Sequence, residues 1–199
     1  MRPSTTSYRP AVLATAALVL SLTACGGATS PAATAPATAS TTSAPGIVST
    51  HGNADVAFIQ DMAPHHSGAI AMAELAASRA GSAQVKDLAR RISGAQGPEI
   101  ERMTAMASAW RVTLDTGAAP MGGMSAMGGD DVAALTPLSG TAFDKEFLLR
   151  MTAHHTSAVE MARTELSQGT NPQAKDLATA IVAAQQKEIA EMRGLLAAA

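Results

Sequence analysis

The chain has 199 residues and a formal net charge of −2 at pH 7, with 15% charged and only 3% aromatic residues. Its lysines and arginines form no basic patch with interleaved aromatic side chains, which argues against nucleic acid as a partner. Cys25 is the single cysteine, so an intramolecular disulfide and any cysteine-based zinc or iron–sulfur site are excluded.

Residues 1–24 are predicted to be a lipoprotein signal peptide. Arg2 and Arg9 give a positive start, and the apolar run 11–22 is shorter than the roughly 20 residues that a membrane span needs. The Leu-Thr-Ala-Cys sequence that follows resembles the bacterial lipoprotein signal, in which cleavage precedes the cysteine. An ordinary signal peptide with an incidental Cys25 is the alternative. We therefore expect Cys25 to carry acyl chains such as palmitate, which would anchor the protein to the extracytoplasmic face of the cell membrane through lipid only.

Residues 25–52 are expected to form a flexible tether. They consist almost entirely of Ala, Thr, Ser, Pro and Gly, a composition that cannot bury enough apolar surface to offset the entropy of ordering. His51, near its end, is expected to be solvated, with a role as an additional metal ligand as the alternative. The remaining residues, 53–199, have the size of one domain.

This domain is an internal duplication. Residues 58–103 align without a gap on residues 147–192 at a constant offset of 89, and the matched positions include Phe, Met, a histidine pair, Gln and Glu. We place the repeats at 53–114 and 139–199, joined by a Met/Gly-rich connection at 115–138.

Each repeat is predicted to be a helical hairpin. Asn171-Pro172 is typical of a helix start, and Ser82 stands at the aligned position of the first repeat. Apolar residues recur at helical spacing and strand patterns are absent, so we predict an all-α, four-helix bundle made of two duplicated helical hairpins. Pro64 and Pro98 fall inside helical patterns, where we expect kinks, with a local break near Pro98 as the alternative.

The side chains with metal-ligand chemistry repeat with the hairpins. At about 100° per residue, the histidine pair and the two methionines of each first helix share one inward face. On each second helix a glutamate lies on the core stripe, where a charged carboxylate needs a cation, a hydrogen-bonded partner or a shifted pKa. The candidate metal ligands are Met62, His65, His66, Met72, Glu99 and Met103, and in the second repeat Met151, His154, His155, Met161, Glu188 and Met192.

Core packing is the alternative for these residues. Taken singly, four of the methionines are better explained by packing, because Met fills irregular gaps in helical cores; they are Met72, Met103, Met161 and Met192. The histidines differ, since four of the five in the chain form two matched pairs, which favours a ligand role or a proton-linked site.

The connection between the repeats carries a second candidate metal site. Met121, Met124 and Met127 are spaced M-x-x-M-x-x-M in a Gly-rich segment that has no apolar pattern to bury. Thioethers are soft ligands that suit Cu(I), and glycine lets such a segment wrap an ion. A merely disordered loop is the alternative.

Several of these motifs resemble one bacterial family. They are Met-x-x-His-His followed by Met-Ala in each half, the Ala-x-x-Ile-x-x-Ala-Gln-x-x-Glu-Ile segments at 89–100 and 178–189, and the Met/Gly connection. Together they are similar to domain of unknown function 305, over roughly residues 53–197. The resemblance implies a ferritin-like fold, frequent secretion or lipid anchoring, and copper binding and tolerance in some members. Val132-Ala133 departs from the pattern, since many members have another Met there.

Three functions are consistent with the sequence. The leading one is sequestration, tolerance or delivery of copper outside the cytoplasmic membrane, without catalysis, because His and Met suit Cu(I) and Cu(II). A ferritin-like dimetal oxidoreductase using iron or manganese is the second, although its Glu-x-x-His motif is missing. A structural or interaction lipoprotein with a buried His/Glu network is the third. A metallochaperone or a second copy of the chain as partner, and any enzymatic activity, are left open.

Overall fold

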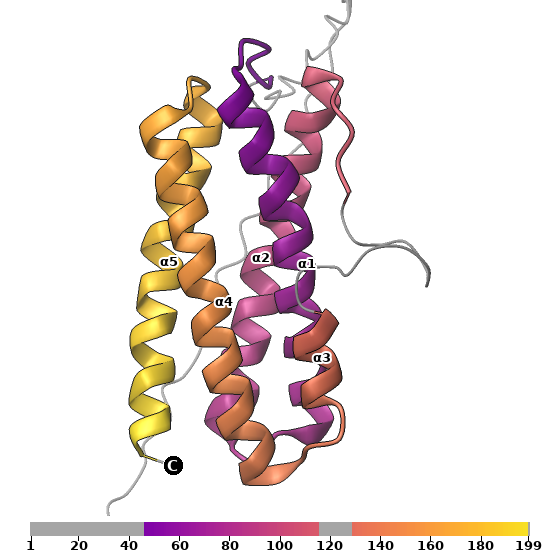
Figure 1. Cartoon of the computed structure of the whole chain (residues 1–199), viewed down its shortest axis with the longest axis vertical. Coiled ribbons are helices and arrows are strands. Elements are labelled where there is room, and N and C mark those ends of the chain that lie inside the picture. Colours follow the sequence, from indigo (N-terminus) through magenta and orange to yellow (C-terminus); the bar gives the residue numbers. More distant parts are fainter. Residues whose placement is uncertain (1–45, 116–128, 199) are drawn as a thin grey trace, which may run out of the picture. The chain divides into compact units, whose positions relative to one another are not determined.

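Residues 46–115 and 129–198, which the computed structural model describes, form four long helices and one short helix, without strands (Figure 1). All five belong to one compact unit, Ser43–Ala199. They are α1 (Asn53–Arg79), α2 (Ala83–Trp110), α3 (Gly129–Leu135), α4 (Gly140–Gln168) and α5 (Pro172–Ala197). The all-α fold of two duplicated hairpins is confirmed, with α1 and α2 in one repeat and α4 and α5 in the other. None of the five has the length and apolar character needed to cross a membrane.

The two predicted helix starts are confirmed. The Asn171 side chain accepts a hydrogen bond from the backbone N–H of Gln173, and α5 begins directly after it. Ser82 accepts one from the N–H of Gln84 at the start of α2. Both caps satisfy donors that the first turn of a helix leaves without a partner.

Both internal prolines lie within continuous helices. α1 runs through Pro64 and α2 runs through Pro98, so the local break that was considered near Pro98 does not occur. Pro98 and Gly94, whose carbonyl loses its helical donor, are both exposed. Water can therefore hydrogen-bond to that carbonyl, and the packing of the long helix offsets the remaining cost.

Two aspartates tie the repeats together. Asp55 of α1 accepts hydrogen bonds of 2.8 to 3.2 Å from the N–H groups of residues 170–171, in the turn before α5. Asp144 of α4, its partner in the alignment, accepts bonds of 3.0 and 2.8 Å from the N–H groups of residues 81–82, in the turn before α2. The turn of each hairpin is thus held by the first helix of the other. We call these two contacts the aspartate clasps.

The core consists of two hydrophobic clusters stacked along the bundle. One, the α3-end cluster, joins the C-terminal half of α1 to the N-terminal halves of α2 and α4 and contains Leu135 of α3. The other, the Trp110-end cluster, joins the N-terminal half of α1 to the C-terminal halves of α2 and α4 and the start of α5. On α1 the clusters are separated by residues 64–68, and on α4 by residues 152–157.

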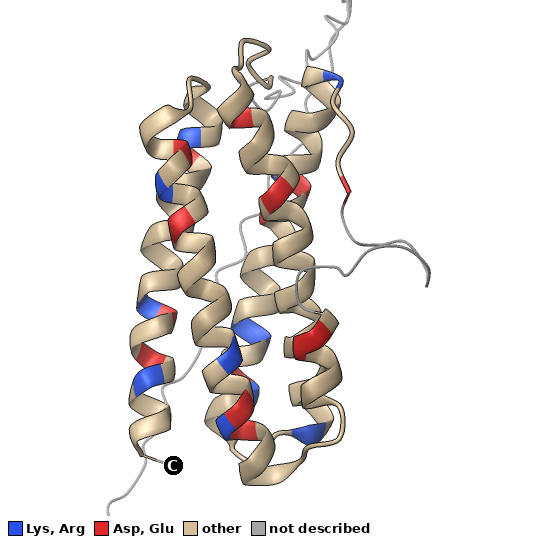
Figure 2. Cartoon of the chain, in the orientation of Figure 1, with Lys and Arg blue, Asp and Glu red and all other residues tan. Residues whose placement is uncertain are grey.

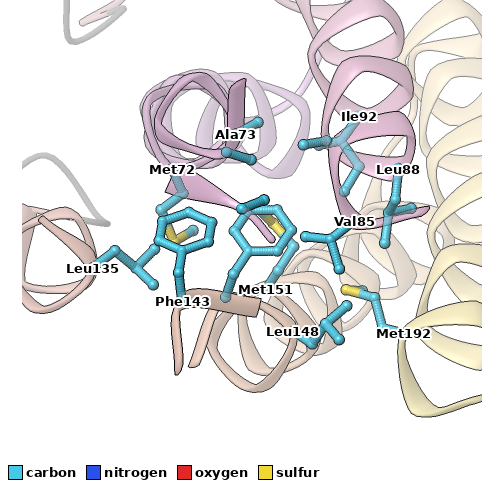
Figure 3. Close-up of a cluster of buried hydrophobic side chains, with 14 of the residues drawn as sticks. Met72, Ala73, Val85, Leu88, Ile92, Leu135, Phe143, Leu148, Met151 and Met192 are labelled. Atoms are coloured by element: carbon cyan, nitrogen blue, oxygen red, sulfur yellow. The ribbon is translucent and has the colours of Figure 1, made fainter. Parts of the chain in front are cut away.

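Helix α3 was not predicted and lies within the connection between the repeats. It contacts both α1 and α4, and its Leu135 is fully buried. Figure 3 shows Leu135 beside Phe143 and Met72 in the α3-end cluster. Val132 also packs against this cluster, so its apolar side chain has a structural role at the position where the sequence departs from the family pattern. Seven residues are too few for a periodic signal, which is why the sequence did not reveal this helix.

The residues just before α1 are attached to one end of the bundle. The Val48 carbonyl accepts hydrogen bonds from Trp110 Nε1 at 2.9 Å and from Asn171 Nδ2 at 3.0 Å. The His51 ring stacks on Trp110 with 4.7 Å between centroids. The expectation that His51 is solvated is therefore wrong, because this aromatic contact half-buries the imidazole.

Candidate metal centre

The two histidine pairs form one buried layer between the hydrophobic clusters. His66 and His155 have no exposed surface, and His65 and His154 keep 3% and 7%. The rings of His65 and His154 come from different repeats and meet with 3.6 Å between their centroids. Figure 2 shows the middle of α1 and of α4, where the two histidine pairs stand, without charged residues. The predicted convergence of the histidine pairs is what the structure shows.

His66 and His155 are each hydrogen-bonded to a glutamate of the neighbouring helix. His66 Nε2 donates to Glu99 Oε2 at 2.7 Å, and His155 Nε2 donates to Glu188 Oε2 at 2.8 Å. Because a carboxylate only accepts, the proton of a neutral imidazole must lie on Nε2, which leaves the lone pair on Nδ1. The Nδ1 atoms of His66 and His155 are buried and have no hydrogen-bond partner among the described residues.

This geometry favours an orienting role for the two glutamates. Histidines that bind metal commonly donate their second ring N–H to a carboxylate, which fixes the tautomer and the direction of the ring. Glu99 and Glu188 occupy that outer position here, and both are partly buried. The sequence placed them on the core stripe as direct ligands, since helix phase cannot tell an oxygen that faces a metal from one that faces an imidazole.

His65 is held in the same tautomer by a serine that the sequence analysis missed. The Ser157 hydroxyl donates to the carbonyl of His154, so it accepts the proton of His65 Nε2 at 2.7 Å. Burial, followed by the neighbouring His154, lowers the pKa of His65 to about 2. The imidazole is therefore neutral at physiological pH, and its Nδ1 has no hydrogen-bond partner within the described part of the chain. Ser157 aligns with Gly68, so the duplication gave no signal for it.

Two glutamines contribute further buried polar atoms that have no hydrogen-bond partner among the described residues. Gln96 and Gln185 stand three residues before the two glutamates and are buried. Both amide atoms of Gln96 and the Oε1 of Gln185 lack a hydrogen-bond partner in the described residues. Burying such a group without a partner costs about 1–3 kcal/mol. These glutamines repeat at the offset of 89, but they were not among the predicted ligands.

The methionines lie on both sides of the histidine layer. Five of the six candidates are fully buried in the clusters, as core packing predicts, and a ligand role for them stays a prediction. Met161 is only partly buried. Met62 and Met103 belong to the Trp110-end cluster, and Met72, Met151 and Met192 to the α3-end cluster.

The described side chains of the layer are not arranged as a closed set of metal ligands. Among the residues that the structure describes, no three His, Cys, Asp or Glu side chains are placed to hold a metal together. The His65 and His154 rings, at 3.6 Å, are too close for an ion between them, because each ligand nitrogen lies about 2 Å from a metal. Binding through both would require one ring to rotate. Cys25 and the loop methionines Met121, Met124 and Met127 lie outside the described residues.

The sequence matches the family Domain of unknown function (DUF305) over residues 55–196. A DUF305 protein of Streptomyces coelicolor, predicted to be secreted, is 28% identical with a TM-score of 0.64, and the match covers 72% of this chain and 92% of that one. A DUF305 fragment from Deinococcus radiodurans is also 28% identical, with a TM-score of 0.64 and coverages of 78% and 100%.

A third solved structure is CopM in a Cu(II)-bound form. It is 33% identical with a TM-score of 0.62, and the match covers 71% of this chain and 95% of CopM. CopM has also been solved in Cu(I)-bound, Ag-bound and apo forms. No curated protein matches the chain.

Proposed function

The chain belongs to the DUF305 family, and on that premise we propose that it binds copper through its buried histidine layer. The observation that carries this proposal is the set of three buried Nδ1 atoms, on His65, His66 and His155, that have no hydrogen-bond partner among the described residues. Each is fixed by a hydrogen bond at Nε2, to Ser157, Glu99 or Glu188 respectively. A histidine must be neutral to bind a metal, and these three are held in the tautomer that offers Nδ1.

The donor set supports copper over harder ions. Neutral imidazoles surrounded by buried thioethers suit Cu(I), and imidazole alone suits Cu(II), whereas Mg²⁺ and Ca²⁺ prefer several carboxylate or carbonyl oxygens. The similarity to CopM, whose structures contain Cu(I), Cu(II) and Ag, points in the same direction. Met121, Met124 and Met127 form a second proposed Cu(I) site.

We place this activity outside the cytoplasm, with Cys25 as the lipidated residue. The signal-like N-terminus supports that location, and so does the family relation to a protein predicted to be secreted. Storage or delivery of copper fits better than catalysis, because the described part of the layer supplies two carboxylates and both are bound to histidines. A dimetal oxidoreductase would use about four inward glutamates.

Copper titration of the full chain under anaerobic conditions tests the proposal. The change is a variant with His65, His66, His154 and His155 replaced by Asn, and the matched control is His51→Ala, which removes a histidine outside the layer. We expect the wild type and the control to compete with a chromophoric chelator for Cu(I), and the four-histidine variant to lose the tightest site.

Equal affinity of the folded four-histidine variant and the wild type would refute the histidine site. Iron or manganese found at two ions per chain in protein purified from its own envelope would instead support the dimetal alternative. A melting temperature that no metal changes would favour a purely structural His/Glu network.

A further inference from the structure

A surface groove lies between α1 and α4 at the Trp110 end of the bundle. Its volume is about 290 Å³, and its walls include Ala54 and Asp61 of α1 and Met161, Thr164 and Glu165 of α4. Asp61 and Thr164 are exposed, and Met161 is partly buried. We call this feature the α1–α4 groove.

The duplication places an equivalent groove at the other end, where α3 covers it. At the offset of 89, the counterparts of Ala54, Asp61 and Met161 are Phe143, Arg150 and Met72. There Leu135 of α3 is fully buried, and Asp131 of α3 binds Arg150 at 2.6 Å. Of two equivalent seams between α1 and α4, one is therefore covered by a helix, and no described segment of the chain covers the other.

The two seams also differ in chemistry. The open one presents the carboxylate of Asp61 and the thioether of Met161. The covered one has the guanidinium of Arg150 where Asp61 would be, and its Met72 is completely buried. A carboxylate at the mouth of a groove attracts a cation and raises its rate of association, and a thioether is a ligand for soft metals.

The open groove leads to the histidine layer. Asp61 stands four residues before His65, and Met161 four residues after Ser157, so each pair shares one helix face. His65 and Ser157 are hydrogen-bonded to each other across the α1–α4 seam at 2.7 Å. One helical turn therefore separates the groove from the layer.

The part of the histidine layer that is slightly exposed lies at the α1–α4 seam, as the route from the groove requires. His65 and His154, which meet at the seam, keep a small exposed surface, whereas His66 and His155, on the sides facing α2 and α5, have none. An ion that arrives along the seam would meet the first two imidazoles before the others.

We propose that copper reaches and leaves the histidine layer through the α1–α4 groove, with Asp61 attracting the ion and Met161 binding it transiently. This route rests on the proposed copper-binding function and adds to it the path by which the ion enters and leaves. The ion keeps its oxidation state along the route. Asp61 and Met161 act on the rates of uptake and release and are not ligands of the final site.

The test is the rate of Cu(I) transfer between a bicinchoninate complex and the full chain, followed by stopped-flow absorbance without oxygen. For Asp61→Asn/Met161→Leu we expect uptake and release to slow by about tenfold each, since steering by one fixed charge and a soft ligand is lost. The dissociation constant should stay within about twofold of the wild type, because a change in the barrier alone alters both rates by the same factor. The control Glu74→Gln/Met106→Leu removes an exposed carboxylate of α1 and a buried thioether of α2 away from the groove, and it should transfer Cu(I) at the wild-type rate.

A second variant blocks the groove by its volume. Ala54→Phe installs the ring that the covered seam has at Phe143, and it should slow transfer in both directions while the melting temperature is kept. Wild-type rates in either variant would overturn the route. A weaker dissociation constant with an unchanged uptake rate would do so too, since Met161 would then belong to the final site.

Failure of the route is distinguishable from failure of the proposed function. If the wild type binds Cu(I) no better than the four-histidine variant, the copper site itself is refuted. If the wild type binds through its histidines and the groove variants exchange at its rate, only the route is refuted.

Discussion

The two ends of the bundle descend from one duplicated sequence and have become different. Each has an aspartate clasp and a cap residue at aligned positions, and the histidine layer lies between the two ends. Around this shared frame the α3 end has gained a covering helix and the Arg150–Asp131 ion pair. The Trp110 end has an open groove and a second buried carboxyl, Glu165, where the α3 end has Ala76. The features that both ends share, the clasps and the caps, support the fold and the histidine layer. The features that differ, helix α3 and the groove, decide which end of the α1–α4 seam is accessible.

The largest expected effect is a loss of stability that differs between the two aspartate clasps. Asp55→Ala leaves the N–H of the buried Asn171 and the part-buried N–H and hydroxyl of Thr170 without their acceptor, and should lower the free energy of unfolding by about 4 kcal/mol. Asp144→Ala removes two backbone hydrogen bonds and should cost about 2 kcal/mol. Urea denaturation of both variants measures the difference. Equal losses would mean that the clasps are energetically equivalent despite their different surroundings.

Removal of the α3 contact comes next. Leu135→Ala deletes a fully buried side chain of the α3-end cluster and should destabilise the protein by about 3 kcal/mol. Leu149→Ala on α4 is the matched control, since Leu149 is 55% exposed. Denaturant midpoints compare the two. A loss as small as that of the control would show that α3 adds little to the α3 end.

Substitution of either orienting glutamate should weaken Cu(I) binding by a similar factor. Glu99→Gln and Glu188→Gln each replace the acceptor that orients a histidine and should weaken Cu(I) binding about 10- to 100-fold, with little effect on folding. Chelator competition measures both dissociation constants. An effect in only one variant would mean that the two halves of the layer do not contribute alike.

The smallest expected effect is a pH dependence of stability that comes from Glu165 at the Trp110 end. Burial and the nearby Asp55 raise the pKa of Glu165 from 4.5 to about 7. The folded protein therefore holds this proton more tightly than the unfolded chain between these pH values, so the Glu165 contribution to stability falls as pH rises through that window. The melting temperature of the wild type minus that of Glu165→Gln should decrease from pH 5 to pH 8.

Other titrating groups do not disturb this difference. His65 has a pKa lowered from 6.5 to about 2, so its contribution to stability rises with pH up to about 6.5, and subtraction of the variant cancels it. For Asp55, burial raises the pKa, but hydrogen bonds from Gly52 and Asn171 lower it to about 2. The contribution of Asp55 is therefore lost only as pH falls from 3.8 towards 2, outside the measured range. A flat difference curve would contradict the assignment to Glu165.

The sequence revealed those parts of the fold and site that repeat. The duplicated His pairs, Glu99 and Glu188, and the caps at Ser82 and Asn171 all stand at aligned positions, and local rules of helix phase and capping explain where they lie. Such rules also placed Glu99 and Glu188 inward. They could not show that both carboxylates face imidazoles, because that depends on the rotation of two packed helices.

The missed features depend on contacts between distant segments. Ser157 pairs with a histidine 92 residues away, and Asp55 with a turn 115 residues away. Helix α3 is too short for periodicity, and the groove exists because, within residues 46–115 and 129–198, no segment covers one of two related seams. None of these has a local pattern, although Asp55 and Asp144 are aligned and could have been noticed as inward acids near a helix start.

The aspartate clasps cross between the repeats, so a single hairpin would carry an aspartate and a turn that cannot satisfy each other within one molecule. Two identical hairpins could exchange these contacts reciprocally about a two-fold axis. The gene before duplication is thus expected to have encoded a homodimer, and fusion turned an assembly step that depended on concentration into an intramolecular one. An isolated segment 46–115 that is folded and monomeric in gel filtration would contradict this history.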